Sequence, residues 1–292
     1  MLKPNEILEA SISAGEAKAK NGFVKLAVLG FLAGACIAFG AQASNMAAFN
    51  LLASPGTYGL GRILAGSIFA VGLMLVLLSG CELFTGNILM IGGVIRKRIK
   101  LRTMLFNWCV VYAANFLGAV FIAWMLSKSG LFHSGADLLG GVTVKIAAGK
   151  TSLPFFSAFV LGIMCNWLVC LAVWLSYAAD NMVGKIFGIF FPICLFVTSG
   201  FEHSIANMYF VPAGIFAKAS QAFVDSAISI GAAQDAIGAL TWGNFCVANL
   251  IPVTLGNIIG GGVFVSMAYL LAFKNPRIGG DGREPKDRHD AS

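Results

Sequence analysis

Charged residues are scarce in this sequence, because Lys, Arg, Asp and Glu together make up 11% of its 292 residues. A soluble domain usually carries about 25% charged residues, so the composition excludes an ordinary soluble protein. Apolar residues take up the difference: 58% of the chain is hydrophobic, and its mean hydropathy is +0.83. The sequence therefore predicts an integral membrane protein.

Patterns that mark several other protein classes are also missing. The seven cysteines form no CxxC pair and no Cys/His cluster with metal-ligand spacing, so we expect no metal site. HExxH, GxSxG and a phosphate-binding glycine loop are absent, which disfavours an enzyme and gives no reason to expect a cofactor. The 35 glycines follow no triplet period, which excludes a collagen-like chain. They suit close approach of helices in a membrane.

Six apolar stretches are each long enough to cross about 30 Å of hydrocarbon. They cover residues 26–50, 63–95, 104–126, 155–178, 186–216 and 246–273. Of the 20 Lys and Arg residues, 15 lie on the side of the membrane that carries both termini and five on the other. Basic loops stay in the cytoplasm, so we expect a multi-pass protein of a bacterial inner (plasma) membrane with cytoplasmic N- and C-termini.

The same charge distribution makes nucleic acid an improbable partner, and the basic loops are assigned to orientation and to attraction of anionic lipid. Residues 1–25 lack the apolar core and the cleavage site of a signal peptide. They predict an amphipathic cytoplasmic segment, either an interfacial lead-in helix or a gating element. Residues 26–273 form the predicted six-helix transmembrane domain, and residues 274–292 a polar cytoplasmic tail.

A short motif occurs twice inside apolar sequence. Residues 79–87 and 199–207 both read S-G-x-E-x-x-x-x-N, 120 positions apart. Carboxylates and amides are costly at membrane depth, so both copies are candidate functional sites. Residues 115–121 (NFLGAVF) similarly resemble residues 257–264 (NIIGGGVF). Three spans per copy require the second copy to enter the membrane from the opposite side.

These repeats predict an all-α integral membrane fold with six transmembrane helices in an inverted 3+3 repeat. Spans two and five exceed one crossing and carry the motif, so each is expected to break into two half-helices. Unwound backbone is tolerated there only if it is buried or lines a water-accessible path. The arrangement is aquaporin-like, although the sequence contains no Asn-Pro-Ala box.

Four segments together resemble the formate/nitrite transporter family. They are residues 82–87 (ELFTGN), 165–174 (CNWLVCLAVW), 200–208 (GFEHSIANM) and 249–261 (NLIPVTLGNIIGG). The resemblance implies a homopentamer in which each protomer has its own path for small monovalent anions such as formate, nitrite or hydrosulfide. The second copy of the motif resembles that of formate-type members, whereas the first, with Cys81 and Glu82, is nearer to nitrite or hydrosulfide members.

The resemblance also implies roles for apolar residues of the path. Leu83 and Phe196 are expected at the periplasmic constriction and Phe69 at the cytoplasmic one, with Phe84 also on the path. The alternative for all four is plain packing.

Polar residues of the path follow from the same motifs. His203 is expected at the centre, Thr85 in the loop that breaks span two, Asn166 orienting the histidine, and Lys150 at the periplasmic mouth. The alternatives are a structurally satisfied buried histidine and, for Lys150, a solvated loop charge. Six residues are expected to hold the helix breaks together: Glu82, Asn87, Glu202, Asn207, Asn115 and Asn257.

These residues suit a weak acid, because a desolvated anion is far more expensive at membrane depth than its neutral acid. An unperturbed imidazole titrates near pH 6.5, so His203 predicts proton-coupled or pH-dependent passage. Formate is the expected substrate, with nitrite or hydrosulfide as the alternative. A non-transporting membrane sensor or a membrane enzyme is the alternative of another class.

Overall fold

The computed structural model describes residues 1–273, and these residues form helices and connecting turns with no strand. The predicted tail, residues 274–292, lies outside the described residues. Six helices are long and apolar enough to cross a membrane. The predicted all-α membrane fold is confirmed.

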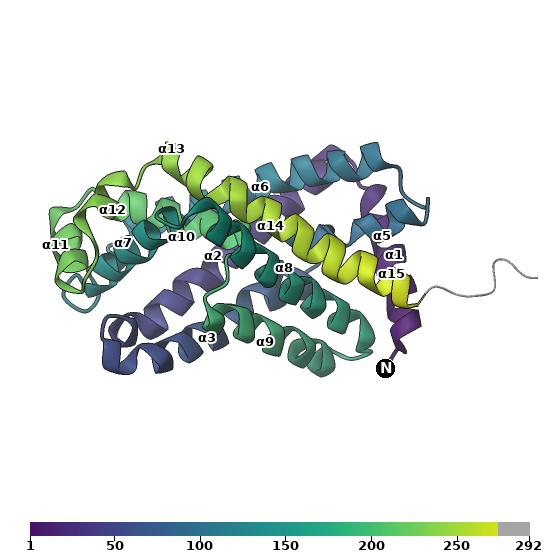
Figure 1. Cartoon of the computed structure of the whole chain (residues 1–292), viewed down its shortest axis with the longest axis horizontal. Coiled ribbons are helices and arrows are strands. Elements are labelled where there is room, and N and C mark those ends of the chain that lie inside the picture. Colours follow the sequence, from purple (N-terminus) through teal and green to yellow (C-terminus); the bar gives the residue numbers. More distant parts are fainter. Residues whose placement is uncertain (274–292) are drawn as a thin grey trace, which may run out of the picture.

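In Figure 1, α3 and α9 run along one edge of the molecule and α6 lies at the opposite edge, while α8 and α14 cross between them. The bounds of the first five membrane-spanning helices are α2 (Phe23–Leu52), α3 (Tyr58–Leu78), α6 (Leu101–Lys128), α8 (Phe155–Ala178) and α9 (Met182–Ser199). The sixth span runs from Trp242 to Ala272 and consists of α13 (Trp242–Asn244), α14 (Ile251–Gly261) and α15 (Ala268–Ala272), joined by π-helical turns.

The second and fifth apolar stretches are interrupted where the S-G-x-E motif occurs. After α3 the chain continues as the short helices α4 (Phe84–Asn87) and α5 (Met90–Ile95), and after α9 it continues as α10 (Ser204–Ala217). Gly80 and Gly200 adopt φ values of 75° and 83°, a left-handed conformation that glycine tolerates at the end of a helix. Each break is then tied to a neighbouring helix by the backbone N–H of its glutamate, which donates to Leu29 O in the first half (3.2 Å) and to Leu161 O in the second (3.3 Å).

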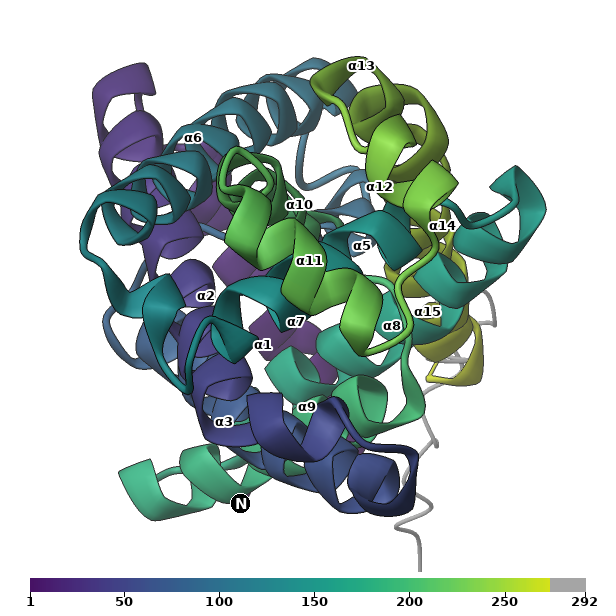
Figure 2. The same ribbon diagram turned by 90° about the vertical axis from the view of Figure 1, so that its left-hand side faces the viewer.

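Helices between the spans were not expected from the sequence. They are α7 (Leu138–Thr151), α11 (Gln221–Ser229) and α12 (Gln234–Ala239). Figure 2 looks along the long axis and shows α7 and α11 lying across that end of the molecule. The stretch treated as a loop between spans three and four therefore contains the helix α7, which packs against α10. The 14 residues of α7 are mostly buried but too few to cross a membrane, so span-length criteria missed them.

Helix α1 (Pro4–Ala19) packs against α5 and α8, with Ile7, Leu8 and Ile12 buried. Lys18 in its last turn reaches the break in the first half. Leu26, at the expected start of the transmembrane domain, lies in the first turn of α2, which begins at Phe23. The N-terminal helix therefore forms part of the packed protein as well as leading into the first span.

Candidate functional site

Glu202 is the centre of a buried polar cluster at the break in the second half. Its carboxylate accepts hydrogen bonds from Lys150 Nζ at 2.7 Å and from Asn207 Nδ2 at 2.6 Å. Asn207 also donates to Asn249 Oδ1 at 2.8 Å. Lys150 lies in the last turn of α7 with a side chain 17% exposed. It is therefore no solvated loop charge but an ion-pair partner of the break.

The break in the first half contains the same cluster. Glu82 accepts from Lys18 Nζ at 2.9 Å and from Asn87 Nδ2 at 2.7 Å, and Asn87 donates to Asn107 Oδ1 at 2.9 Å. Lys18 also donates to Asn87 Oδ1 at 2.8 Å. Each buried carboxylate thus has a cation and an amide as partners, which a charge at this depth requires.

Sequence reasoning missed Lys18, which it counted only as one of the basic residues that set orientation. A spacing signal was available. Lys18 and Lys150 are 132 positions apart, and so are Gly30 and Gly162, whose carbonyls occupy matching places in the two halves. Helix α1 ends one residue after its lysine, and α7 does the same. The repeated unit therefore consists of a short helix followed by three spans.

Two asparagines hold the breaks in place. Asn115 accepts from Phe84 N–H at 3.0 Å and donates to Gly30 O (2.7 Å) and Glu82 O (2.9 Å). Asn257 accepts from Ser204 N–H at 2.9 Å and donates to the carbonyls of two residues at matching positions, Gly162 (2.8 Å) and Glu202 (3.0 Å). Each side chain thus binds two backbone groups that the interrupted helix leaves without intrahelical partners and ties them to a carbonyl of a continuous neighbouring helix, α2 or α8.

The two breaks meet at a hydrogen bond between Thr85 and His203. Thr85 Oγ1 lies 2.9 Å from His203 Nε2, and both residues are buried. The backbone N–H of Ala206 donates to His203 Nδ1 at 3.0 Å, so Nδ1 carries no hydrogen. The neutral imidazole is therefore protonated at Nε2 and donates to Thr85. The threonine hydroxyl hydrogen remains free to point into the path.

Asn166 was expected to orient the histidine, but its hydrogen bonds lie elsewhere. Its Nδ2 donates to Thr85 O at 3.2 Å and to Asn257 O at 2.8 Å. Its Oδ1 is buried without a hydrogen-bond partner among residues 1–273. Asn166 thus supports the threonine of the central pair through the backbone and makes no hydrogen bond to His203.

The apolar residues of the path group differently from the prediction. The rings of Phe69 and Phe196 contact each other edge to face, with centroids 5.7 Å apart, and both line a cavity of about 100 Å³ that also contains Lys150 and His203. Leu83 lies on the opposite side of the central pair, beside the small cavity that contains Lys18. The expected pairing of Leu83 with Phe196 is therefore wrong, because Phe69 on α3 faces Phe196 on α9 across the path.

Phe84 lines none of the cavities that contain the two lysines and the histidine. Its ring packs edge to face on Trp108 and Tyr112, at centroid distances of 5.7 and 4.9 Å. In the one-turn helix α4 it points away from the central pair, so its expected place on the path is wrong. Its neighbours Leu83 and Thr85 point inward.

The cavities and constrictions together form a series. A cavity of about 380 Å³ at Lys18 leads to Leu83 and then to the Thr85–His203 pair, and on the other side of this pair His203, Phe69, Phe196 and Lys150 line one further cavity. A polar centre thus lies between two apolar constrictions, with a partly buried lysine–glutamate ion pair at each end.

Arg62 lines the cavity at Lys150 and was not singled out from the sequence. Its guanidinium donates to the carbonyls of Val197 and of Thr198, the latter at 3.3 Å from Nε. It thereby caps the last turn of α9, which carries Phe196, and a cation is favourable at that end of a helix. Within residues 1–273 no three His, Cys, Asp or Glu side chains are grouped so as to hold a metal ion.

Known proteins share this architecture over nearly the whole chain. The family model described as formate/nitrite transporter matches residues 5–271. A probable formate transporter of Methanothermobacter thermautotrophicus is 40% identical, covering 91% of this chain and 95% of that protein. The formate channel FocA of Escherichia coli (strain K12) is 35% identical, covering 94% and 95%.

Two solved structures agree with the sequence comparisons. A pentameric formate channel with formate bound is 36% identical and matches with a TM-score of 0.75 over 87% of this chain and 98% of its own. An ion channel of the FNT family is 28% identical, with a TM-score of 0.77 over 91% and 98%. These relatives are transporters and channels and not enzymes. The chain belongs to the formate/nitrite transporter family.

Proposed function

We propose that this protein is a homopentameric channel of a bacterial inner membrane in which each protomer passes formate in a pH-dependent manner. The observation that carries the proposal is the Thr85–His203 hydrogen bond between two apolar constrictions. The related formate channels and the pentameric structure with formate bound support the substrate and the assembly.

The energetics favour passage as the neutral acid. A formate anion that leaves water for the constrictions loses hydration worth many kcal/mol, whereas formic acid loses little beyond its hydrogen bonds. The lysines at the two ends attract an anion to the mouths of the path. Each lysine is already paired with a glutamate, so this attraction is modest and an anion can leave again.

The central pair supplies hydrogen bonds at the narrow part of the path. Thr85 receives the Nε2 hydrogen of His203 and directs its own hydroxyl hydrogen toward the passing molecule. His203 is linked through this hydroxyl to any acceptor in the path. When the imidazole takes up a proton from water at Nδ1, which breaks the bond from Ala206 N–H, the imidazolium can pass its Nε2 hydrogen to the threonine while the threonine's own hydroxyl hydrogen moves to a carboxylate, and the imidazole is left neutral with its hydrogen on Nδ1. Uptake is therefore expected to depend on pH. The Lys18 end is assigned to the cytoplasm by the distribution of basic residues.

The test is formate flux into proteoliposomes across a range of pH. His203→Phe removes the bond to Thr85 and leaves the Ala206 N–H without an acceptor, so flux should fall about tenfold or more and lose its pH dependence. His133→Asn is the matched control, because His133 lies on the surface with a 65% exposed side chain. Unchanged flux and pH profile in His203→Phe would reject the role of the histidine.

The substrate is tested in the same assay by competition among formate, nitrite and hydrosulfide. Formate should compete most strongly. Preferential competition by nitrite or hydrosulfide would instead favour the substrates suggested by Cys81 and Glu82 in the first motif. Absence of flux for all three anions would support a sensor and reject the channel.

A further inference from the structure

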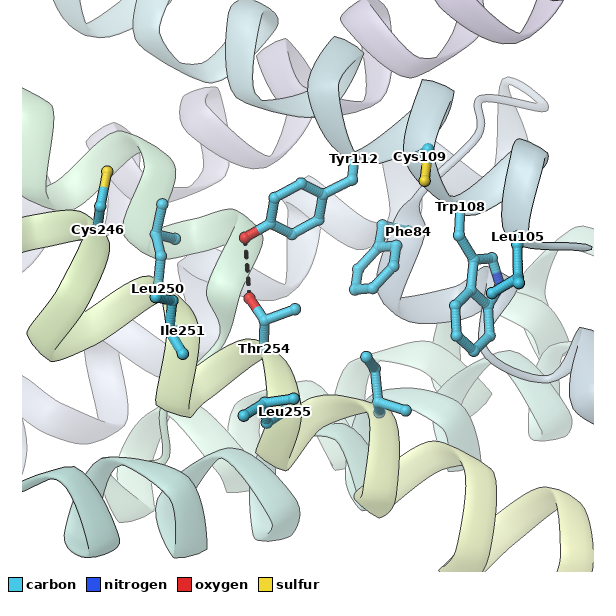
Figure 3. Close-up of a pocket in the computed structure, with 11 residues that line it drawn as sticks. Phe84, Leu105, Trp108, Cys109, Tyr112, Cys246, Leu250, Ile251, Thr254 and Leu255 are labelled. Atoms are coloured by element: carbon cyan, nitrogen blue, oxygen red, sulfur yellow. Dashed lines mark hydrogen bonds between the residues drawn. The ribbon is translucent and has the colours of Figure 1, made fainter.

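A large apolar groove lies outside the path. It is a groove of about 470 Å³ between α6 and the sixth span, and Figure 3 shows side chains of both helices facing each other across it. One wall contains Leu105, Trp108, Cys109 and Tyr112, and the other runs from Cys246 to Ile258. Both walls belong to membrane-spanning helices, so the groove opens where lipid chains lie.

No charged residue among residues 1–273 lines this groove, and the Tyr, Thr and Trp side chains in its walls are already hydrogen-bonded. Tyr112 Oη and Thr254 Oγ1 bond to each other at 2.9 Å, as drawn in Figure 3. Trp108 Nε1 donates to Asn87 O at 3.0 Å. A polar occupant would lose its hydration without gaining a partner. The groove therefore suits a hydrocarbon chain.

The length of the groove fits one half of a bilayer. Twelve residues separate Cys246 from Ile258, which corresponds to about 18 Å of helix, and one leaflet of hydrocarbon is about 15 Å thick. The wall at Phe245–Leu250 is π-helical, a geometry that often marks functional sites in helices. The groove is thus long enough to hold one acyl chain of a single leaflet.

Charge at one end of the groove identifies the headgroup. Arg102, Leu105, Cys109 and Tyr112 follow one another at helical spacings of three, four and three, so they share one stripe of α6. Arg102 is exposed at the start of that helix and forms no ion pair or hydrogen bond with any residue from 1 to 273. An exposed guanidinium beside the end of an apolar groove suits a phosphate.

From these observations we propose that the groove binds one acyl chain of an anionic phospholipid whose headgroup lies at Arg102. The chain packs on Phe84, whose ring lines the groove. Phe84 stands between Leu83 and Thr85, and both of these face the path. A bound lipid therefore supports the break in the first half from outside, and the site is independent of which anion passes through the path.

The experiment is native mass spectrometry of the purified full chain after reconstitution with equal amounts of phosphatidylglycerol and phosphatidylcholine. The unsubstituted protein should retain phosphatidylglycerol in preference to phosphatidylcholine. Cys109→Trp fills the groove and should lower lipid retention at least fivefold. Leu117→Trp is the matched control, because Leu117 is 61% exposed on the same helix and does not line the groove. It should retain lipid as the unsubstituted protein does.

Two further variants keep the test decisive. Ile251→Trp fills the groove from the other wall and replaces Cys109→Trp if the latter fails to assemble. Arg102→Gln should remove the preference for phosphatidylglycerol while retaining lipid. The proposal is overturned if both groove-filling variants retain lipid like the unsubstituted protein. It is equally overturned if N-ethylmaleimide labels Cys109 of the delipidated protein only after the oligomer is dissociated, which would mean that a second copy covers the groove.

Discussion

The breaks in the two halves differ much less in their framework than in the residues that face the path. Glu82 and Glu202 each accept from a lysine and an asparagine, and Asn115 and Asn257 each join three backbone groups. The residue after each glutamate differs, however, and is Leu83 in one half and His203 in the other.

The polar centre is formed by these differences. Thr85 corresponds to Ile205, and Asn166 stands where the first half has Gly34. Asn166 bonds to the carbonyl of Thr85, and His203 bonds to its hydroxyl. The first half thus contributes one hydroxyl and the second half the groups that orient it. The residues that stabilise the breaks thus occur in both halves, whereas the polar centre needs one residue from each half.

The largest expected effect comes from removing the framework of either break. Asn115→Leu and Asn257→Leu each leave one buried N–H and the carbonyl of the glutamate at the break without their side-chain partner, at about 1–3 kcal/mol for each group. Both variants should lose most of the assembled protein, and to a similar extent. Size-exclusion chromatography and thermal unfolding in detergent measure this loss. A large loss in only one variant would contradict the equivalence of the two frameworks.

The lysines give the next largest effect. Lys18→Met and Lys150→Met each leave a buried carboxylate without its cation, which costs about 2–5 kcal/mol when such a pair is fully desolvated. The loss should be smaller at Lys18, whose side chain is 25% exposed against 17% for Lys150. Thermal unfolding of the detergent-solubilised protein measures both.

A second substitution controls the lysine experiment. Lys150→Met combined with Glu202→Gln removes both charges and should recover part of the lost stability, because the remaining amide needs no cation. Lys18→Met with Glu82→Gln is its counterpart in the first half. Failure of both double variants to recover any stability would show that the lysines act through packing.

Thr85 gives the smallest effect and tests the difference between the halves. Thr85→Val keeps the shape but removes the hydroxyl, and one net hydrogen bond of about 0.5–1.5 kcal/mol corresponds to a fall in formate flux of about two- to tenfold. Thr85→Ser should restore the flux. Ile205→Val, at the corresponding position, should leave it unchanged. If Thr85→Val and Ile205→Val lowered formate flux equally, the assignment of Thr85 to the polar centre would be rejected.

Local motifs made the breaks and their framework predictable. A glutamate, an asparagine and a glycine inside apolar sequence indicate an interruption whatever the packing, and their repetition indicates two. The place of Phe69 could not be predicted in this way, because the contact with Phe196 depends on how α3 and α9 are rotated against each other. Phe84 was misplaced because adjacent residues of a one-turn helix point in different directions.

The missed helix α7 and the missed partner Lys18 have one physical cause. Lys18 lies on α1, and both α1 and α7 are short helices that are stabilised by tertiary packing. Neither helix is long enough to cross a membrane. Hydropathy therefore recorded α1 as a surface segment and α7 as a loop. The spacing of 132 residues between the two lysines was present in the sequence and would have placed both.

The correspondence of α1 with α7 matters for anyone who modifies the protein. A deletion of residues 1–19 would remove the cation from Glu82 and is equivalent to cutting α7 out of the other half. The residues just before α1 are also in contact with the rest of the protein, because Leu2 N–H donates to Ala178 O at the end of α8. A bulky fusion partner placed directly before Pro4 would replace this contact and clash with the end of α8.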